Sequence, residues 1–223
     1  LTSVAIEFIA FRWVRGAPDF TMLLTSFGIH FVVQAIFVMY VSANVRQFDR
    51  PDWIADTLEI GGIRFEVFDL VTIGVTAITL FGTVLLLQRT LFGVSLRAAA
   101  EDFDAARLMG VRSDRVIRGA FILAGLLAGI AAVFVLMRTG RASPTAGLTP
   151  MLKGVLAALI GGLGSLQGAV LGGFVLGLAE VFLIARLPDG WVGLTNGIVF
   201  LLIALLFVFR PGGLINVGHV ERV

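Results

Sequence analysis

The sequence predicts an all-α protein: a polytopic integral membrane helical bundle with one short cytoplasmic helix and one glycine-rich hairpin of short helices. Two features of the composition support this class. Of the 223 residues 58% are hydrophobic, with a mean hydropathy of +0.99, and only 14% are charged, against about 25% in soluble domains. The third observation is that apolar residues gather in stretches of about 20, the length that spans a bilayer as a helix.

The apolar stretches of the sequence differ in length. A long apolar stretch reads as one membrane-spanning helix, and there are four of these: 20–42, 67–87, 120–137 and 190–209. Two further stretches, 151–163 and 168–184, form the expected hairpin. The first of them is roughly 20 Å long as a helix, short of the ~30 Å hydrocarbon core. A tilted helix, a locally thinned bilayer and a re-entrant helix remain open.

Composition also excludes several functions. Without cysteine the chain forms no disulfide or thiolate metal site, and His30 and His219 lie far apart in the sequence, which argues against a metal centre. An isoelectric point near 9.9 could indicate nucleic-acid binding, but the net charge is only +2 and the basic residues lie beside apolar stretches, as topology signals do. We therefore expect a lipid bilayer as partner, and no nucleic acid.

We expect one transmembrane domain over residues 1–223. Segment 1–11 contains Glu7 and lacks the basic start of a cleavable signal peptide. Because the chain opens on Leu1 rather than methionine, a fragment whose start is missing is the simplest expectation.

Arginine placement predicts the orientation. Segment 89–119 contains six arginines and is therefore placed in the cytoplasm. Counting outward, 1–19 is also inside, the acidic segment 45–66 is outside, and the C-terminus is inside if the two short stretches form one hairpin. The loop with Arg138 and Arg141 disagrees, since it is basic and would lie outside.

Glycines recur at a spacing of four, as in Gly164, Gly168 and Gly172, in Gly173 and Gly177, and in Gly125 and Gly129. In lipid, small residues at this spacing let helix backbones approach closely. Packing within the chain, a seam with another subunit and a sliding helix all fit this pattern.

Glu180 is the most informative single residue. An ionisable group within an apolar run costs free energy to place in the membrane and usually faces protein or water. It either lines or supports a solute pathway, or has a structural role. In that role it accepts a hydrogen bond from a nearby helix end or lies near the membrane interface in contact with Arg186. His30 and Gln34 share one face of their helix, which favours hydrogen bonding between helices over ligand binding. Lys153 is expected to extend to the outer membrane surface.

The polar segment 89–119 contains a helical pattern of its own. Its apolar face comprises Leu96, Ala99, Ala100, Phe103 and Ala106, and its polar face Arg97, Glu101 and Asp104. Gly110 is a plausible helix stop, and Ser113 a plausible cap of the next helix. A solvated connector needs no apolar face, whereas a helix that docks into a partner's groove does.

No catalytic machinery is recognisable in the sequence. A phosphate-binding loop needs Gly-Lys-Ser/Thr, but Leu152 precedes the single lysine, Lys153. Neither a Ser/His/Asp set nor a metal cluster has credible spacing. We therefore expect no enzyme activity and no cofactor.

Several motifs, in order, resemble a known family. Arg97-Ala-Ala-Ala-Glu101-Asp102 with Ala106-Arg107-Leu-Met-Gly110-Val resembles the cytoplasmic loop of bacterial ABC-importer permeases of the branched-chain amino acid (LivH/LivM) family, and the LivH-type half more than the LivM-type. Gly161-Gly162-Leu-Gly164-Ser165 with Gly168, Gly172, Gly177 and Glu180 resembles the same family's glycine-rich segment, and Arg210-Pro211-Gly212-Gly213 its C-terminal exit.

The resemblance implies a multi-pass permease subunit of the bacterial cytoplasmic (inner) membrane. Its implied partners are a second, LivM-like permease, two cytoplasmic ABC ATPases and a periplasmic solute-binding protein. Segment 89–119 becomes the coupling loop, and 98–110 the helix that enters the ATPase. The implied coupling residues are Arg97, Ala98, Ala99, Ala100, Glu101, Asp102, Ala106 and Gly110. Those implied for the translocation path or helix packing are Glu180, Gly161, Gly164, Gly168, Gly172 and Gly177.

Two other classes stay open. A secondary transporter or channel fragment that works without an ATPase would need ion-coupling carboxylates in several spans and inverted repeats. A structural membrane scaffold would explain the glycine-rich packing but not the docking helix. The substrate is the least determined property, because the binding protein carries most of the selectivity in such importers.

Overall fold

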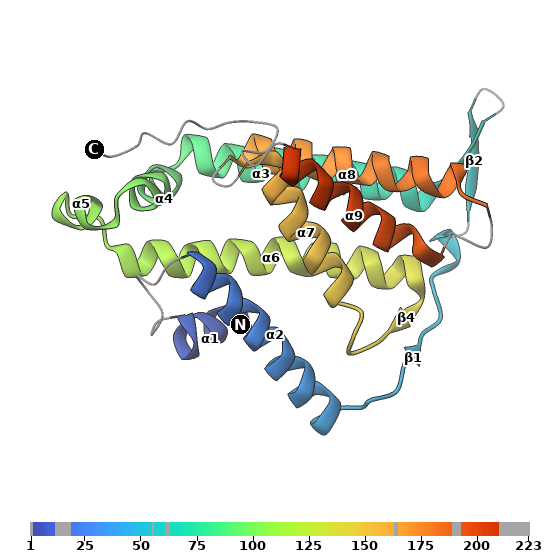
Figure 1. Ribbon diagram of the computed structural model, residues 1–223, viewed down its shortest axis with the longest axis horizontal. Helices are drawn as coiled ribbons and strands as arrows, with labels where there is room; N and C mark the ends of the chain where they lie inside the picture. The colour runs from blue at the N-terminus through green and yellow to red at the C-terminus, as the bar shows by residue number, and fades with distance from the viewer. Residues whose placement is uncertain are drawn as a thin grey trace. The chain divides into compact units, whose positions relative to one another are not determined.

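The computed structural model describes residues 2–11, 19–54, 56–60, 63–162, 165–188 and 193–209. The chain divides into two compact units, Leu1–Pro144 and Thr145–Val223 (Figure 1). The single transmembrane domain expected over 1–223 stays a prediction.

Helices dominate both units, as expected for an all-α membrane protein. The helices and strands of the first unit are α1 (Thr2–Ile9), α2 (Asp19–Tyr40), β1 (Arg46–Gln47), the 3-10 turn η2 (Asp52–Ile54), β2 (Thr57–Ile60), β3 (Ile63–Glu66), α3 (Val67–Arg89), α4 (Leu91–Glu101), α5 (Phe103–Leu108), α6 (Ser113–Thr139) and β4 (Arg141–Ala142). Those of the second are α7 (Leu148–Gly161), α8 (Leu166–Arg186) and α9 (Thr195–Phe209).

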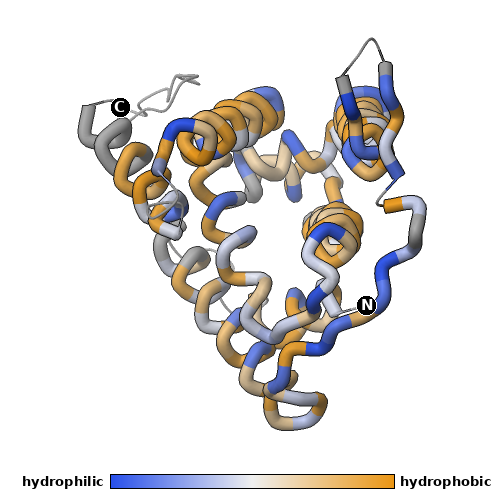
Figure 2. The backbone as a smooth tube through the Cα atoms, turned by 90° about the vertical axis from the view of Figure 1, so that its right-hand side faces the viewer, coloured by the Kyte–Doolittle hydropathy of each residue, from blue (hydrophilic) through white to orange (hydrophobic). Residues whose placement is uncertain are grey.

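Three described helices are long and apolar enough to cross a membrane: Val67–Arg89, Asp114–Thr139 and Leu166–Arg186. Hydrophobic residues run along these helices, while hydrophilic residues gather in the connections (Figure 2). In α6 none of the apolar window is buried. Surface of this kind must be covered by lipid or by another protein.

The expected spans largely coincide with helices. Stretch 20–42 forms α2 and stretch 67–87 lies within α3, while 120–137 is the central part of the longer α6. Helix α6 ends at Gly140, whose φ of 62° is the left-handed conformation that a helix C-terminus favours, and its N–H donates to the carbonyl of Leu136.

Phe68 is the centre of packing where α3 begins. It is buried, and its ring lies 6.4 Å from that of Trp53 in η2 and 5.9 Å from that of Phe134 in α6. This aromatic contact brings the start of α3 together with the C-terminal half of α6. The two helices are therefore antiparallel neighbours at this end of the unit.

Helix α1 packs on the N-terminal half of α6. The ring of Phe11 lies 5.1 Å from that of Phe121, and the Ser3 hydroxyl donates to the Phe121 carbonyl. Glu7 is almost fully buried, and its Oε2 lies 4.0 Å from Nε of Arg118. A buried carboxylate needs such a cationic partner to offset its lost hydration.

Two short strand pairs were not expected from the sequence. Strands β2 and β3 pair antiparallel, and Glu59 faces Arg64 at 2.7 Å between Oε1 and Nε. A Gly-Gly pair between two runs that alternate in polarity is a hairpin signal, and Gly61 and Gly62, which lie outside the described residues, provide it. Strand β1 pairs with β4, almost a hundred positions away, and no local pattern predicts that pairing.

The second unit is built around a small apolar core. Ile160 of α7, Leu176 of α8 and Val199 of α9 are buried against one another, with Leu156 and Leu183 partly buried around them. The predicted stretch 151–163 thus forms most of α7, which ends at Gly161. Stretch 168–184 lies within α8, which was expected to be a short helix but is long enough to cross a membrane. For 190–209, α9 begins at Thr195, and residues 190–192 lie outside the described residues.

Candidate functional site

The segment between α3 and α6 contains two helices where the sequence predicted one over 98–110. The break is at Asp102, whose backbone is extended (φ −149°, ψ 107°). The carboxylate of Asp102 accepts a hydrogen bond from the backbone N–H of Ala105 at 3.0 Å. Asp102 therefore caps the start of α5, a typical role for aspartate at a helix N-terminus.

The predicted stop at Gly110 is confirmed. Its φ is +87°, and its N–H donates to the Arg107 carbonyl while the N–H of Val111 donates to that of Ala106. These two bonds form a Schellman motif, which a glycine at this place favours. The cap predicted for the next helix is off by one residue, because Arg112 is the cap and Ser113 the first helical residue of α6.

The exposed apolar surface of this segment differs from the predicted face. Ala106 is buried, as is Val116 of the neighbouring α6, so this part of the predicted face packs within the chain. Among the described side chains of α5 and its C-terminal turn, the exposed large apolar ones are Leu108 and Met109, at 89% and 86% exposure. Ala106 is thus not available for docking, whereas the end of α5 is.

Helix α4 is held against the end of α3. The guanidinium of Arg97, which was predicted on the polar face, donates a hydrogen bond to the carbonyl of Leu87 in the last turn of α3. A Cβ on Gly93 would collide with the same carbonyl, and one on Gly119 would collide with the Phe92 ring. The backbone of Glu101 ends α4, and its side chain lies outside the described ones. Of the other predicted coupling residues, Ala98 and Ala100 are exposed and Ala99 is half-buried.

The glycine pattern forms a seam between α7 and α8. A Cβ on Gly161 would collide with the Gly168 carbonyl, one on Gly168 with the Gly161 carbonyl, and one on Gly172 with the carbonyl of Ala157. The two backbones thus touch where the helices leave the connection between them. These three glycines therefore pack within the chain, one of the three roles that the sequence left open.

The other glycines differ. Among the described residues, a Cβ on Gly177 or Gly129 would meet nothing within 4 Å, whereas one on Gly125 would collide with Ser3 of α1. Gly164 lies outside the described residues.

Glu180 has a partner that the sequence analysis missed. Its Oε1 accepts a hydrogen bond from Nζ of Lys153 at 2.6 Å, and both side chains are about three-quarters buried. Contact with Arg186, one of the alternatives that the sequence left open, is not observed, because that guanidinium lies over the ring of Phe182, 5.2 Å from its centre. Lys153, expected at the membrane surface, is turned to Glu180 instead. No sequence signal joined the two residues, which are 27 positions apart.

The structure does not support the predicted hydrogen bond from His30 and Gln34 to another helix. Nε2 of His30 is buried and has no hydrogen-bond partner among the described residues. The bond to another helix that was predicted for His30 and Gln34 is therefore not found in this part of the chain. No group of three or more His, Cys, Asp or Glu side chains that could hold a metal ion occurs among the described residues.

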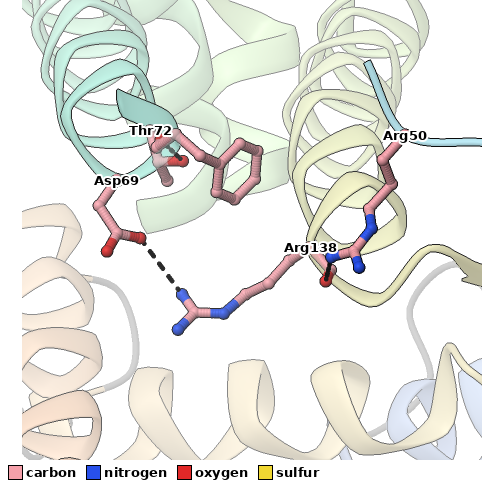
Figure 3. A network of polar contacts seen from close by, with 5 residues as sticks. Arg50, Asp69, Thr72 and Arg138 are labelled. Atoms are coloured by element: carbon pink, nitrogen blue, oxygen red, sulfur yellow. Dashed lines mark hydrogen bonds and ion pairs between the residues drawn. The ribbon is translucent and has the colours of Figure 1, made fainter. Parts of the chain in front are cut away.

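A polar network surrounds the basic loop whose charge disagreed with the predicted orientation. Arg138 lies 3.7 Å from Asp69 between Nη1 and Oδ1, and its carbonyl accepts a bond from Arg50 (Figure 3). With the β1–β4 pair, this contact puts segment 45–66 and loop 138–142 at the same end of the unit. The positive charge of Arg138 lies beside an acid there, so the loop is less cationic than its sequence suggests.

Comparison with known proteins decides the family. A profile described as branched-chain amino acid transport system / permease component matches residues 4–209. The chain belongs to this permease family. It is a family of transport subunits rather than of enzymes, and it serves ABC importers, which work with ATPase and binding-protein partners.

Individual relatives of the permease agree with this assignment. The chain is 30% identical to the high-affinity branched-chain amino acid permease BraD of Pseudomonas aeruginosa, over 98% of this chain and 71% of that protein. It is 28% identical to LivH of Escherichia coli K12 over the same shares. The xylose permease XylH of Escherichia coli K12 is 32% identical over 55% of this chain and 33% of its own. No solved structure matches.

Proposed function

We propose that this permease forms the translocation path of a binding-protein-dependent ABC importer for amino acids, with branched-chain amino acids as the substrate class. The observation that carries the substrate class is the similarity to BraD and LivH over 98% of the chain. Similarity to the xylose permease covers only about half of it. Similarity to a sugar permease over about half of the chain indicates that this part of the sequence does not by itself define the substrate.

The proposed orientation places α4 and α5 in the cytoplasm of a multi-pass inner-membrane protein. Six arginines in 89–119 support this placement through the positive-inside rule. The opposite end of the unit, with β1 and β4, then faces the periplasm. There Asp69 forms an ion pair with Arg138, and strand β1 of the acidic segment 45–66 pairs with β4.

The proposed coupling element is the α4–α5 segment within 89–119. The exposed Leu108 and Met109 give it an apolar end suited to a groove on an ATPase. The Asp102 cap and the Arg97–Leu87 bond connect this end to α3, so movement of an ATPase at α5 is transmitted to a membrane-spanning helix. ATP-driven closure would thereby bias the permease between two states.

The proposed assembly contains a second, LivM-like permease and two ATPases, with a periplasmic binding protein above. Its support is the apolar surface of α3 and α6, which the described residues of this chain leave largely uncovered. A second permease and lipid together would cover such helices.

The test is co-purification of the full-length protein from native membranes with identification of its partners, together with amino-acid uptake. With Leu108→Ser, the ATPase should no longer co-purify and uptake should be abolished, while the protein still inserts into the membrane. Leu91→Ser is the matched control, because Leu91 is as exposed (87%) but lies at the start of α4. It should keep both the ATPase and uptake.

Charge reversal at Glu101 belongs to the same test. If Glu101 contacts basic groups of the ATPase, Glu101→Lys abolishes uptake and leaves insertion intact. Normal uptake in Glu101→Lys and Leu108→Ser would refute coupling through this segment. Recovery of the protein alone from native membranes would favour the secondary transporter or channel.

A further inference from the structure

We propose that the Lys153–Glu180 ion pair sets the depth of α7 along α8, and with it the level in the membrane at which α7 ends at Gly161. Glu180 is then a positioning residue. This inference does not rest on the proposed substrate or on ATPase coupling, because it concerns the register of two helices in one chain.

The pair extends the glycine seam. On α7, Lys153, Ala157 and Gly161 are four residues apart and share a face, and on α8 the same spacing aligns Gly168, Gly172 and Glu180 with the buried Leu176. Gly161 contacts Gly168, Ala157 contacts Gly172, and Lys153 contacts Glu180. The antiparallel seam therefore has backbone contact at one end and a charged contact at the other.

Hydrophobic length alone does not fix the position of α7. Its 14 residues span about 21 Å, whereas the hydrocarbon core is ~30 Å thick. A helix this short can lie at several depths without exposing more apolar surface to water. The glycine contacts themselves permit sliding, since small residues offer no interlocking side chains. Beside them, Ile160 and Leu176 pack through apolar contacts, and the ion pair adds a directional contact that favours one register.

The geometry of the pair gives it a direction. Glu180 is two helical turns beyond Gly172, but Lys153 only one turn before Ala157, so the lysine extends about 6 Å toward the C-terminal end of α8. Arg186, which ends α8, is about 9 Å farther on. An unpaired lysine extends to the nearest water, and here that lies in the same direction. Without Glu180, Lys153 would therefore draw α7 toward that surface.

Cross-linking can measure this register directly. The sequence contains no cysteine, so the pair Ala157→Cys and Gly173→Cys introduces a defined reporter. A Cβ on Gly173 would lie 3.9 Å from that of Ala157 and would meet no other atom within 4 Å. This separation is within the 3.5–4.5 Å range of disulfides. The full-length protein in its own membrane would be oxidised mildly and the rate of disulfide formation measured.

Added to the reporter, Glu180→Gln should slow cross-linking by roughly three- to tenfold, the size expected for polar contacts between membrane helices. Removing the lysine as well, in Lys153→Gln with Glu180→Gln, should restore most of the rate, because nothing then draws α7 away. The exchanged pair Lys153→Glu with Glu180→Lys should restore it too. Arg186→Gln, a charge lost from the same helix without a seam contact, should leave the rate unchanged.

Two results would overturn the inference. One is a parental cross-linking rate in Glu180→Gln. The other is an equally slow rate in the single and the double neutral variants, which would show loss of a contact without displacement by the lysine. If Glu180→Gln does not accumulate in membranes, Glu180→Asp, which keeps the charge on a shorter side chain, should slow cross-linking by a smaller factor.

Discussion

At the scale of single residues, glycine has two distinct uses in this permease. Gly110 and Gly140 end helices in the left-handed conformation, which side chains with a Cβ disfavour. Gly161, Gly168 and Gly172 are instead required by the neighbouring backbone. A spacing of four predicts the second use only when the partner helix is known, because Gly177 has the same spacing but contacts nothing in the part of the chain that the structure describes.

Gly172→Ala and Gly177→Ala make a matched pair in α8. The alanine at 172 would collide with the Ala157 carbonyl, so we expect a loss of about 1–3 kcal/mol in the free energy of unfolding. The alanine at 177 has open space and gains helix propensity, so its effect should lie within about 0.5 kcal/mol or be stabilising. Equilibrium unfolding in detergent measures both. Equal losses at the two positions would contradict the seam.

The ion pair shows where sequence reasoning reaches its limit at this scale. Glu180 stood out because a carboxylate in an apolar run needs a partner. Its partner was not predictable, because Lys153 and Glu180 are on different helices and their contact depends on how α7 and α8 pack. Arg186 is closer to Glu180 in the sequence, but its side chain lies over Phe182.

At the scale of elements, the positions of helices were predictable and their breaks were not. Long apolar stretches gave α2, α3 and α6 because bilayer length is encoded directly in hydropathy. Helix α8 was expected as a short hairpin helix over 168–184, but its 21 residues are long enough to cross a membrane. The break between α4 and α5 at Asp102 was not predictable, because the helical apolar pattern continues across it. An Asp can cap a helix by accepting a hydrogen bond from the backbone N–H three residues later. The presence of an Asp is only a weak signal for a helix start inside such a pattern. The β1–β4 pair joins distant loops and depends on how α3 and α6 pack.

Adjacent residues at the start of α3 test which contact holds this element. Phe68 is buried between Trp53 and Phe134, so Phe68→Ala should cost about 3–5 kcal/mol of unfolding free energy. Arg138 is mostly exposed and Asp69 about half exposed, and an ion pair open to solvent contributes at most about 1 kcal/mol. Asp69→Asn should therefore cost less than that. A larger loss in Asp69→Asn than in Phe68→Ala would show that the polar network, not the aromatic contact, secures α3.

At the scale of the whole molecule, the proposed orientation has a direct test. Ala43→Cys introduces an exposed thiol between α2 and β1, and Arg112→Cys one at the cytoplasmic start of α6. A membrane-impermeant maleimide should label the first in intact spheroplasts and the second only after lysis, because the reagent does not cross the bilayer. Labelling of both after lysis is the control for reactivity. The reverse pattern in intact spheroplasts would invert the topology.

The contact between α1 and α6 has a consequence for biosynthesis. Ser3 and Phe121 are 118 positions apart, and at about 5–20 residues per second the ribosome needs roughly 6 to 24 s to make that length of chain. During this time Glu7 lacks Arg118, its later neighbour. Gly161 and Gly168, in contrast, are only seven positions apart, so α7 and α8 can join as soon as they leave the ribosome. Conditions that slow translation or insertion should therefore harm docking of α1 before they harm the α7–α8 hairpin.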